Sequence, residues 1–188
     1  MEKILIVSSA NRSKELLINI AKESGNYKVL AVSSAIECRE IIKRINFDLI
    51  IINAPLKDDY GKKLSIFINE NTNSDAILIC KNNSEEELYK IEDKGIYIIE
   101  KPLNKPIFIK IINSYIIQRR RYNSIIEENE KLKEKINDIK LIDRAKLTLI
   151  QYLKMSEDES HKYIEKQSMD MRITKVEVAK NILKIYEF

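Results

Sequence analysis

Side chains that commonly act as nucleophiles or as metal ligands are scarce in this chain of 188 residues. It has two cysteines, Cys38 and Cys80, and a single histidine, His161. These are too few for a disulfide framework or a metal cluster. No nucleophile, general base and orienting group stand in a pattern that indicates catalysis. We therefore expect no metal, no cofactor and no enzymatic activity, and we expect His161 to lie exposed on a helix.

Basic side chains near the end of the chain could bind phosphate groups. The candidates are Arg144, Lys146, Lys166, Arg172 and Lys175, and the Thr174 hydroxyl at a predicted helix start could add another contact. Such side chains hold nucleic-acid backbones. Acidic residues share the segment, so a charged and solvated helix surface is the alternative interpretation. The net charge of +4 permits a nucleic-acid partner but does not require one.

The elements that position these residues can be read from the apolar pattern. Four short apolar runs are continuous rather than alternating, and a fifth is weaker: Ile4–Val7, Leu49–Ile52, Ala76–Ile79, Ile96–Ile99 and the weaker Val29–Val32. Continuous runs of this kind are typical of parallel strands that are covered on both faces. Amphipathic stretches lie between them. Residues 1–118 are therefore predicted to form an α/β domain with a doubly wound, five-stranded parallel sheet.

Several polar residues stand directly after these predicted strands: Ser8 and Ser9, Asn53, Cys80, and Lys101 followed by Pro102. Together with the strand–helix alternation, they resemble the receiver domain of response regulators over about residues 1–118. Gly61 lies eight residues after Asn53, which also fits that family. In receivers, an acidic pair after the first strand holds magnesium and an aspartate ending the third strand accepts a phosphoryl group. A Thr or Ser ending the fourth strand and a lysine ending the fifth complete the site.

The residues at these positions cannot support that chemistry. Phosphoryl transfer to a carboxylate needs an anionic oxygen nucleophile and a divalent cation. The Asn53 amide is a poor nucleophile, and the hydroxyls of Ser8 and Ser9 cannot replace two carboxylates as magnesium ligands. We name the five positions, Ser8, Ser9, Asn53, Cys80 and Lys101, the degenerate pocket. We expect it not to be phosphorylated.

Further expectations concern the side chains in and around the degenerate pocket. Cys80 is expected to be a buried, inert thiol rather than a redox sensor. Lys101 is expected either to bond the Asn53 amide oxygen or to point to water. Asp58 and Asp59, in the loop after the third strand, are expected to face solvent.

The stretch from Ile107 to about Lys140 lacks proline and glycine, which predicts a long helix. Six of its residues repeat at spacings of three and four: Tyr122, Ile125, Asn129, Leu132, Ile136 and Ile139. We name this a/d pattern the seam. An asparagine at an a position favours a two-stranded state, so we interpret residues 119–141 as a coiled-coil helix in a parallel homodimer. A helix packed on its own domain is the alternative. The Arg119-Arg120-Arg121 run before the seam is expected to be solvated.

Capping-box patterns predict several helix starts. They occur at Ser34–Glu37, Ser84–Glu87, Ser156–Glu159 and Thr174–Glu177. The last two predict helices that begin near Glu157 and Lys175. With a helix over Ala145–Leu153, these make a three-helix module at residues 142–188. Its predicted core consists of Leu149, Leu153, Tyr163, Ile164, Val178, Ile182, Leu183 and Tyr186.

This module is similar to the ANTAR domain, the RNA-binding module of the AmiR and NasR antitermination regulators. Ala145 and Lys146 match the Ala-Lys pair of that family, and Met169 and Arg172 match its Ala-Met-x-x-Arg segment, with Ser168 in place of the alanine. Other positions also depart from the family pattern: Leu147 replaces a glycine, Ile150 stands where methionine is common, and Ser160 replaces an alanine. Taken with the basic residues above, the resemblance adds Ala145, Ser168 and Met169 to the candidate RNA-binding set, although Met169 is more typical of a core position.

The resemblance implies a function for the whole chain. ANTAR proteins typically join a receiver or pseudo-receiver to the module through a coiled coil, and they bind paired hairpins in nascent leader transcripts. We therefore expect a cytoplasmic, dimeric, RNA-binding antitermination regulator that is not controlled by aspartyl phosphorylation. Its partners would be RNA hairpins, a second copy of itself and possible regulatory proteins, and no membrane. A protein-interaction adaptor that uses a pseudo-receiver and a helical tail is the alternative, and DNA binding is less well supported.

Overall fold

The computed structural model describes residues 1–81 and 93–186. The predicted capping box at Ser84–Glu87 lies outside the described residues. The chain divides into two compact units, unit 1 at Met1–Tyr122 and unit 2 at Asn123–Phe188, and each is described by itself.

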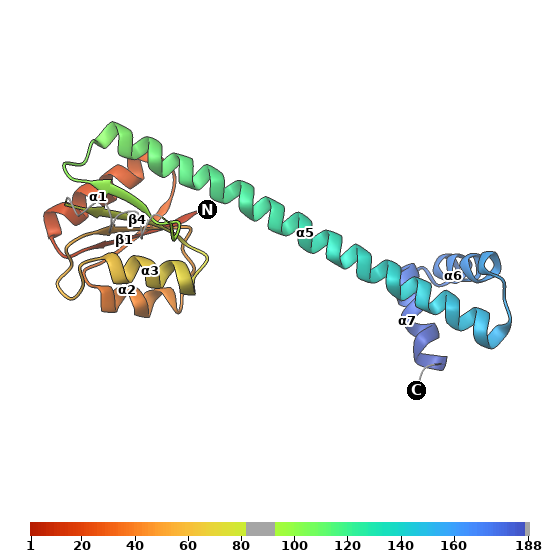
Figure 1. Ribbon diagram of the computed structural model, residues 1–188. Helices are drawn as coiled ribbons and strands as arrows, with labels where there is room; N and C mark the ends of the chain where they lie inside the picture. Colours follow the sequence, from red (N-terminus) through yellow and green to blue (C-terminus); the bar gives the residue numbers. More distant parts are fainter. Residues whose placement is uncertain (82–92, 187–188) are drawn as a thin grey trace. The chain divides into compact units, whose positions relative to one another are not determined.

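Unit 1 is built on a parallel five-stranded sheet with the order β2-β1-β3-β4-β5. Figure 1 shows this sheet between α1 on one side and α2 and α3 on the other. The strands are β1 (Lys3–Ser8), β2 (Lys28–Val32), β3 (Leu49–Asn53), β4 (Asp75–Cys80) and β5 (Tyr97–Glu100). The helices that follow them are α1 (Asn11–Ser24), α2 (Ala35–Ile42), α3 (Lys62–Asn71) and α5 (Lys105–Leu153). The predicted doubly wound α/β fold is confirmed.

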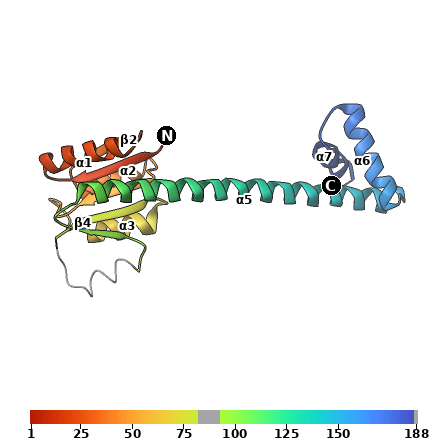
Figure 2. The same ribbon diagram turned by 90° about the horizontal axis from the view of Figure 1, so that it is seen from above.

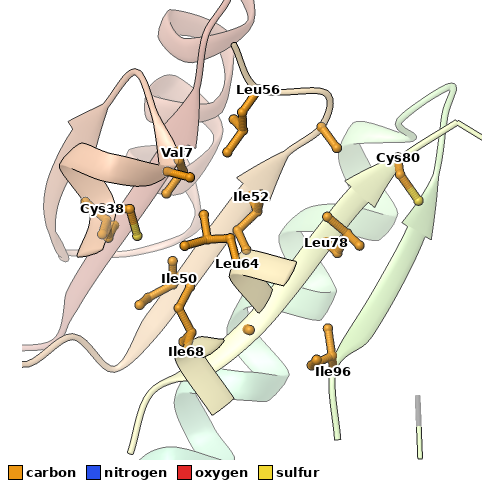
Figure 3. Packing of buried hydrophobic residues seen from close by; sticks show 14 of the residues in the cluster. Val7, Cys38, Ile50, Ile52, Leu56, Leu64, Ile68, Leu78, Cys80 and Ile96 are labelled. Carbon is orange, nitrogen blue, oxygen red and sulfur yellow. The ribbon is translucent and has the colours of Figure 1, made fainter. Parts of the chain in front are cut away.

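Apolar side chains cover both faces of this sheet, which explains why its strands read as continuous apolar runs. On one face, Cys38 of α2 and Leu64 and Ile68 of α3 pack on β1, β3 and β4 (Figure 3). On the other face lie α1 and the first turns of α5, which contributes Phe108 and Ile112; Figure 2 views unit 1 from this side. The C-terminal ends of all five strands lie at one edge of this sheet, because the strands are parallel.

The helix α5 is longer than predicted. A stalk helix ending near residue 140 and a separate helix over Ala145–Leu153 were expected, but one helix of 49 residues spans Lys105–Leu153. The physical reason is that no proline or glycine follows Pro106 of the first turn, so nothing forces a break near residue 141. The helix ends before Lys154, whose φ of 58° is left-handed.

Unit 2 contains two further helices, α6 (Glu157–Met171) and α7 (Lys175–Tyr186), beside the last turns of α5. Both helices begin where the sequence predicted. Ser156 and Glu159 form a complete capping box, and Thr174 and Glu177 exchange the corresponding bonds at 3.0 and 3.2 Å. These bonds satisfy amides that have no partner within the helix.

The core of unit 2 is small and differs in part from the prediction. It consists of Ala145, Leu149, Ile164, Val178, Ala179, Ile182 and Leu183. Leu153 and Tyr163 were expected in it, but both are exposed. Leu153 is the last residue of α5, where the chain turns away from the core. Tyr163 directly precedes the buried Ile164 on α6, so the side chains of Tyr163 and Ile164 point in different directions around that helix.

Among residues 1–81 and 93–186, no helix combines the length and the apolar character that crossing a bilayer requires.

Candidate functional site

The degenerate pocket lies at the C-terminal edge of the sheet in unit 1. Ser8 and Asn53 are neighbours in the β1–β3 register, and both are buried. The Asn53 amide Nδ2 donates a hydrogen bond of 2.9 Å to Ser8 Oγ. Two polar side chains thus satisfy each other at the place where a receiver holds its phosphorylated aspartate and its cation.

Lys101 occupies neither of the two positions expected for it. Its Nζ donates to the Ala54 carbonyl oxygen at 2.6 Å, because the loop after β3 turns this carbonyl toward the end of β5. Burial lowers the pKa of Lys101. Its ammonium therefore holds the backbone just beyond Asn53 rather than the Asn53 amide oxygen.

Ser9 ties three loops together at the same edge. Its hydroxyl donates to the Ser33 carbonyl at 2.9 Å and accepts from the Lys57 amide at 2.8 Å. Lys14 Nζ donates to the Ser33 hydroxyl at 2.8 Å. The loops after β1, β2 and β3 are therefore connected by hydrogen bonds in this edge of the sheet.

Asp58 is exposed, as expected, whereas only 7% of the Asp59 side chain is exposed, which corrects the expectation for that residue. The Asp58 carboxylate accepts bonds of 2.9 Å from the amides of Ala35 and Ile36 at the start of α2. These bonds lower the pKa of Asp58. Asp59 accepts from the Gly61 amide at 2.7 Å and pairs with Arg39. Both acids are occupied by backbone amides that a sequence pattern does not reveal.

Gly61 secures this loop. Its φ of 86° is left-handed, and a Cβ at this position would come within 2.8 Å of the Leu78 side chain. Only glycine fits such a position without strain.

The pocket has the chemistry of a structural site. Cys80 is buried, and burial raises its pKa, as expected for an inert thiol. The part of the chain that the structure describes contains no group of three or more His, Cys, Asp or Glu side chains that could hold a metal ion.

The seam residues are exposed along α5. Tyr122, Ile125, Leu132, Ile136 and Ile139 each keep about half of their surface exposed. The alternative of a helix packed on its own domain applies to Phe108, Ile112 and Ile116, but not to these positions. Asn129 is also exposed, and its Nδ2 donates to the Ile125 carbonyl at 3.0 Å in the same helix. The dimer stays a prediction.

Of the three arginines before the seam, Arg120 and Arg121 are exposed, as expected, whereas the Arg119 side chain is only 15% exposed, which corrects the expectation for that residue. Arg119 lies 3.9 Å from an Asp48 carboxylate oxygen and stacks over the Tyr122 ring. Arg120 pairs with Glu2. Partners so distant in sequence gave no signal in the local pattern.

In unit 2, two candidate RNA-binding lysines form ion pairs near the surface. Lys146 lies 2.8 Å from Asp143 and 3.6 Å from Glu157. Its ion pair with Asp143 raises the pKa of Lys146. Lys175 lies 2.7 Å from Glu165. Both cations are charged and balanced by carboxylates of the same unit.

The remaining candidates differ in accessibility. Arg144, Lys166 and Arg172 are exposed, and Arg172 follows α6 with a left-handed φ of 53°. Met169 is 69% exposed, although a core position was more typical for it. Its exposure follows from α6, which turns Ile164 rather than Met169 toward α7.

Three further candidates have structural duties. Ala145 is fully buried in the core, where it packs rather than offering surface. The Ser168 hydroxyl donates to the Glu165 carbonyl at 2.7 Å, and Thr174 caps α7. His161, by contrast, is exposed on α6 as expected.

Comparison with known proteins agrees with both resemblances. Residues 130–183 match the ANTAR domain family, a match that begins within α5 and ends within α7. No match was found among curated proteins.

Solved receiver domains share the fold of unit 1. A CheY-like receiver domain protein from Methanospirillum hungatei JF-1 has a TM-score of 0.59 and 21% identity, covering 65% of this chain and 98% of that one. A response regulator receiver domain protein from Clostridium thermocellum has a TM-score of 0.59 and 18% identity, covering 65% and 99%. A two-component response regulator from Clostridium difficile has a TM-score of 0.58 and 22% identity, covering 65% and 99%. At such identities the likeness shows the receiver fold alone.

Proposed function

We propose that this protein is an RNA-binding regulator of transcription antitermination. In this proposal, residues 142–188 bind hairpins in nascent transcripts, residues 119–141 pair two copies of the chain, and residues 1–118 form a receiver-like domain. The observation that carries the proposal is the ANTAR match over residues 130–183, in a unit that exposes Arg172 and holds Lys146 and Lys175 half-buried beside carboxylates.

The electrostatics of unit 2 support phosphate binding. Ion pairs between exposed side chains contribute little to stability and exchange readily. A phosphate that approaches Lys175, whose side chain is 40% exposed, can therefore displace the carboxylate of Glu165 at small cost. The Lys146 side chain is 18% exposed and has two carboxylates beside it, so a phosphate there must compete with both Asp143 and Glu157. Arg172 can add a two-pronged contact that lysine cannot make.

Pairing supports the same function. A coiled coil presents two modules at once, so binding of one hairpin turns binding of the second into an intramolecular event. The exposed seam is consistent with a partner helix that a single chain lacks.

The receiver-like domain would act without a phosphoryl switch. Its degenerate pocket has an amide at position 53, which bonds Ser8, and Lys101 bonds the Ala54 carbonyl. A partner protein or a small ligand would then supply the signal. Incubation with acetyl phosphate should add no phosphoryl group to Asn53, as measured by intact-mass spectrometry, and phosphorylation there would contradict this part of the proposal.

The RNA proposal is tested by a mobility shift with two tandem hairpins, against duplex DNA of the same length. We expect RNA binding that weakens steeply with salt, because each phosphate contact releases counterions. The double variant Lys146→Ala/Arg172→Ala should bind much more weakly, and its log–log salt slope should fall by about 1.4 for two lost contacts on unpaired strands.

A matched control removes the same charge elsewhere in unit 2. Lys180 and Lys184 are exposed on α7 and lie outside the candidate set, so Lys180→Ala/Lys184→Ala should change the salt slope much less. Equal losses in both double variants would indicate general charge attraction. A folded wild-type protein that ignores the hairpins at low salt would overturn the proposal.

A further inference from the structure

A cavity of unit 1 lies at the C-terminal ends of β3 and β4. Its volume of about 530 Å³ is within the range of cavities that hold small organic molecules. Its lining includes Ala54, Pro55 and Tyr60 from the loop after β3, and Cys80 and Lys81 from the end of β4. Figure 3 shows the Cys80 side chain at this end of the strand. We name this space the loop cavity.

The loop cavity is separate from the degenerate pocket. Among its described lining residues, only Cys80 belongs to both. Asn53 and Lys101 instead line a smaller cavity of about 230 Å³ beside α1. The internal bonds of the degenerate pocket can therefore stay intact while the loop cavity is occupied. Its position is also one where doubly wound folds bind ligands, outside the carboxyl ends of the strands.

Apolar atoms form much of the wall of the loop cavity. Ala54 and Cys80 are buried, and the Pro55 ring is exposed. Tyr60 is 83% exposed, and its ring therefore leaves much apolar surface in water. A flat ring that packs on this wall would remove that surface from water.

The two acidic residues of the lining already have partners. Only 7% of the Asp59 side chain is exposed, and its carboxylate pairs with Arg39. The Asp58 carboxylate accepts two backbone amides at the start of α2. Arg39 and the positive end of the α2 dipole therefore compensate these two negative charges.

The basic residues of the lining are Lys62, Lys63 and Lys81. Lys63 and Lys81 are exposed, and neither side chain forms an ion pair or a hydrogen bond with a residue that the structure describes. Burial raises the pKa of Cys80, and the nearby charge of Lys62 opposes that rise, so this charge acts on the inner wall. The helix α3 also begins here without an acidic residue in its first turn. All of these groups attract an anion.

We propose that the loop cavity binds a small organic anion with a flat apolar part, such as an aryl carboxylate. The ring would lie against Pro55 and Tyr60, and the anionic group would bind Lys63 and Lys81. An inorganic anion would leave the apolar wall in water, and a neutral ring would leave the lysines without a partner. The inference rests on the proposed function only for its meaning, a bound signal in place of phosphorylation.

Two dyes with the same aromatic rings test the charge requirement in the full-length protein. Anilinonaphthalene sulfonate is an anion, and phenylnaphthylamine lacks the sulfonate. In fluorescence titrations, Lys63→Ala/Lys81→Ala should weaken binding of the sulfonate about tenfold, because two charge contacts are lost. Binding of the neutral dye should stay nearly unchanged. The matched control Lys22→Ala/Lys57→Ala removes two exposed lysines of unit 1 that do not line the cavity, and should change neither affinity.

An introduced indole locates the bound sulfonate dye, because the chain has no tryptophan. Tyr60→Trp places the indole in the wall of the loop cavity. Tyr152→Trp places it in unit 2, at a side chain that is 55% exposed. Energy transfer from indole to dye falls steeply with distance. We therefore expect dye binding to quench the indole emission of Tyr60→Trp strongly and that of Tyr152→Trp weakly.

Three results would overturn the inference. The first is an equal loss of affinity for the sulfonate in the two double variants, which would indicate general charge attraction. The second is quenching in Tyr152→Trp that equals or exceeds quenching in Tyr60→Trp, and the third is a folded wild-type protein that does not bind the sulfonate.

The RNA mobility shift separates this inference from the proposed function. Without dye, Lys63→Ala/Lys81→Ala should bind the tandem hairpins as the wild-type protein does, because both lysines lie in unit 1. A wild-type protein that binds the hairpins but not the sulfonate would contradict the loop cavity alone. One that binds the sulfonate as expected but ignores the hairpins would contradict the proposed function alone.

Discussion

Polar side chains gather at the degenerate pocket of unit 1 and on the surface of unit 2, and the bonds that hold them differ in kind. In the pocket, Asn53 and Ser8 bond each other beneath the surface, and Lys101 bonds a backbone carbonyl. On unit 2, Lys146 and Lys175 meet carboxylates near solvent. The hydrogen bonds of the pocket stand where a receiver would hold its ligand, whereas a ligand can displace the ion pairs on unit 2.

Solvent accessibility accounts for this difference. A buried polar group that loses its partner bears the full cost of desolvation, so the pocket is stable only when its own bonds are intact. An exposed lysine that leaves a carboxylate is immediately hydrated or bound by phosphate. The two regions therefore differ in how much it costs to break their polar contacts.

The largest predicted effect tests whether unit 2, with its small core, is less stable than unit 1. Ile182→Ala removes a side chain that is 6% exposed, whereas Ile185→Ala removes one that is 64% exposed on the same helix. We expect the first to cost about 2–5 kcal/mol and the second to stay within about 0.5 kcal/mol. Hydrogen exchange by mass spectrometry should show faster exchange in α6 and α7 with β1 and β3 unchanged. Uniform acceleration over both units would mean that they unfold together.

The next effect concerns the internal bond of the degenerate pocket. Asn53→Ala removes the donor to Ser8 and should destabilise unit 1 by about 1–3 kcal/mol, because the buried hydroxyl loses its partner. Chemical denaturation of Asn53→Ala, Ser8→Ala and the double variant gives the coupling between the two side chains. A double variant that loses the sum of the two single effects would show that the bond contributes nothing.

A smaller effect is expected when the N-terminal cap of one helix is removed in each unit. Ser156→Ala removes the complete capping box of α6, whereas Ser34→Ala removes a single cap bond at α2. Each should cost about 0.5–2 kcal/mol, with the larger loss at Ser156. Thermal unfolding followed by circular dichroism measures both. A larger loss at Ser34 would indicate that the α2 start depends more on its cap than its Asp58 bonds imply.

The smallest predicted effect concerns an exposed ion pair of unit 2, in contrast to the buried bonds of the degenerate pocket. Glu165→Gln releases Lys175 from its ion pair and should leave the unfolding midpoint nearly unchanged, since the pair is exposed. RNA affinity at low salt should rise modestly, because the lysine no longer has to leave a carboxylate. Asp170→Gln makes the same charge change without freeing Lys175, so an equal rise in both variants would point to net charge alone.

Local sequence patterns correctly predicted the strands and the helix starts, because interactions among neighbouring residues determine them. Continuous apolar runs predicted the strands because both faces of the sheet are covered. The Ser156 and Thr174 patterns predicted helix starts because a capping box is complete within four residues. Proteins with these patterns can be assigned a fold before any contact is known.

Contacts between distant residues were not predictable in this way. Nothing in the loop that holds Asp58 shows that the start of α2 lies beside it. Lys101 bonds Ala54, 47 residues away, and Arg120 bonds Glu2, 118 residues away. The break expected near residue 141 of α5 does not depend on distant contacts. It was expected because the character of the sequence changes there, but the helix continues across this change.

Asp58 also makes the first turn of α2 depend on a carboxylate from another loop. Its two amide bonds contribute stability at pH values above the ordinary pKa of 3.8, and they are lost as the pH falls through the lower pKa of the folded protein. Cys38 lies buried on the inner side of this helix, and burial raises its pKa to about 12. The Cys38 thiol becomes accessible only when α2 separates from the sheet. Its rate of alkylation therefore measures how strongly the Asp58 bonds hold α2 in place.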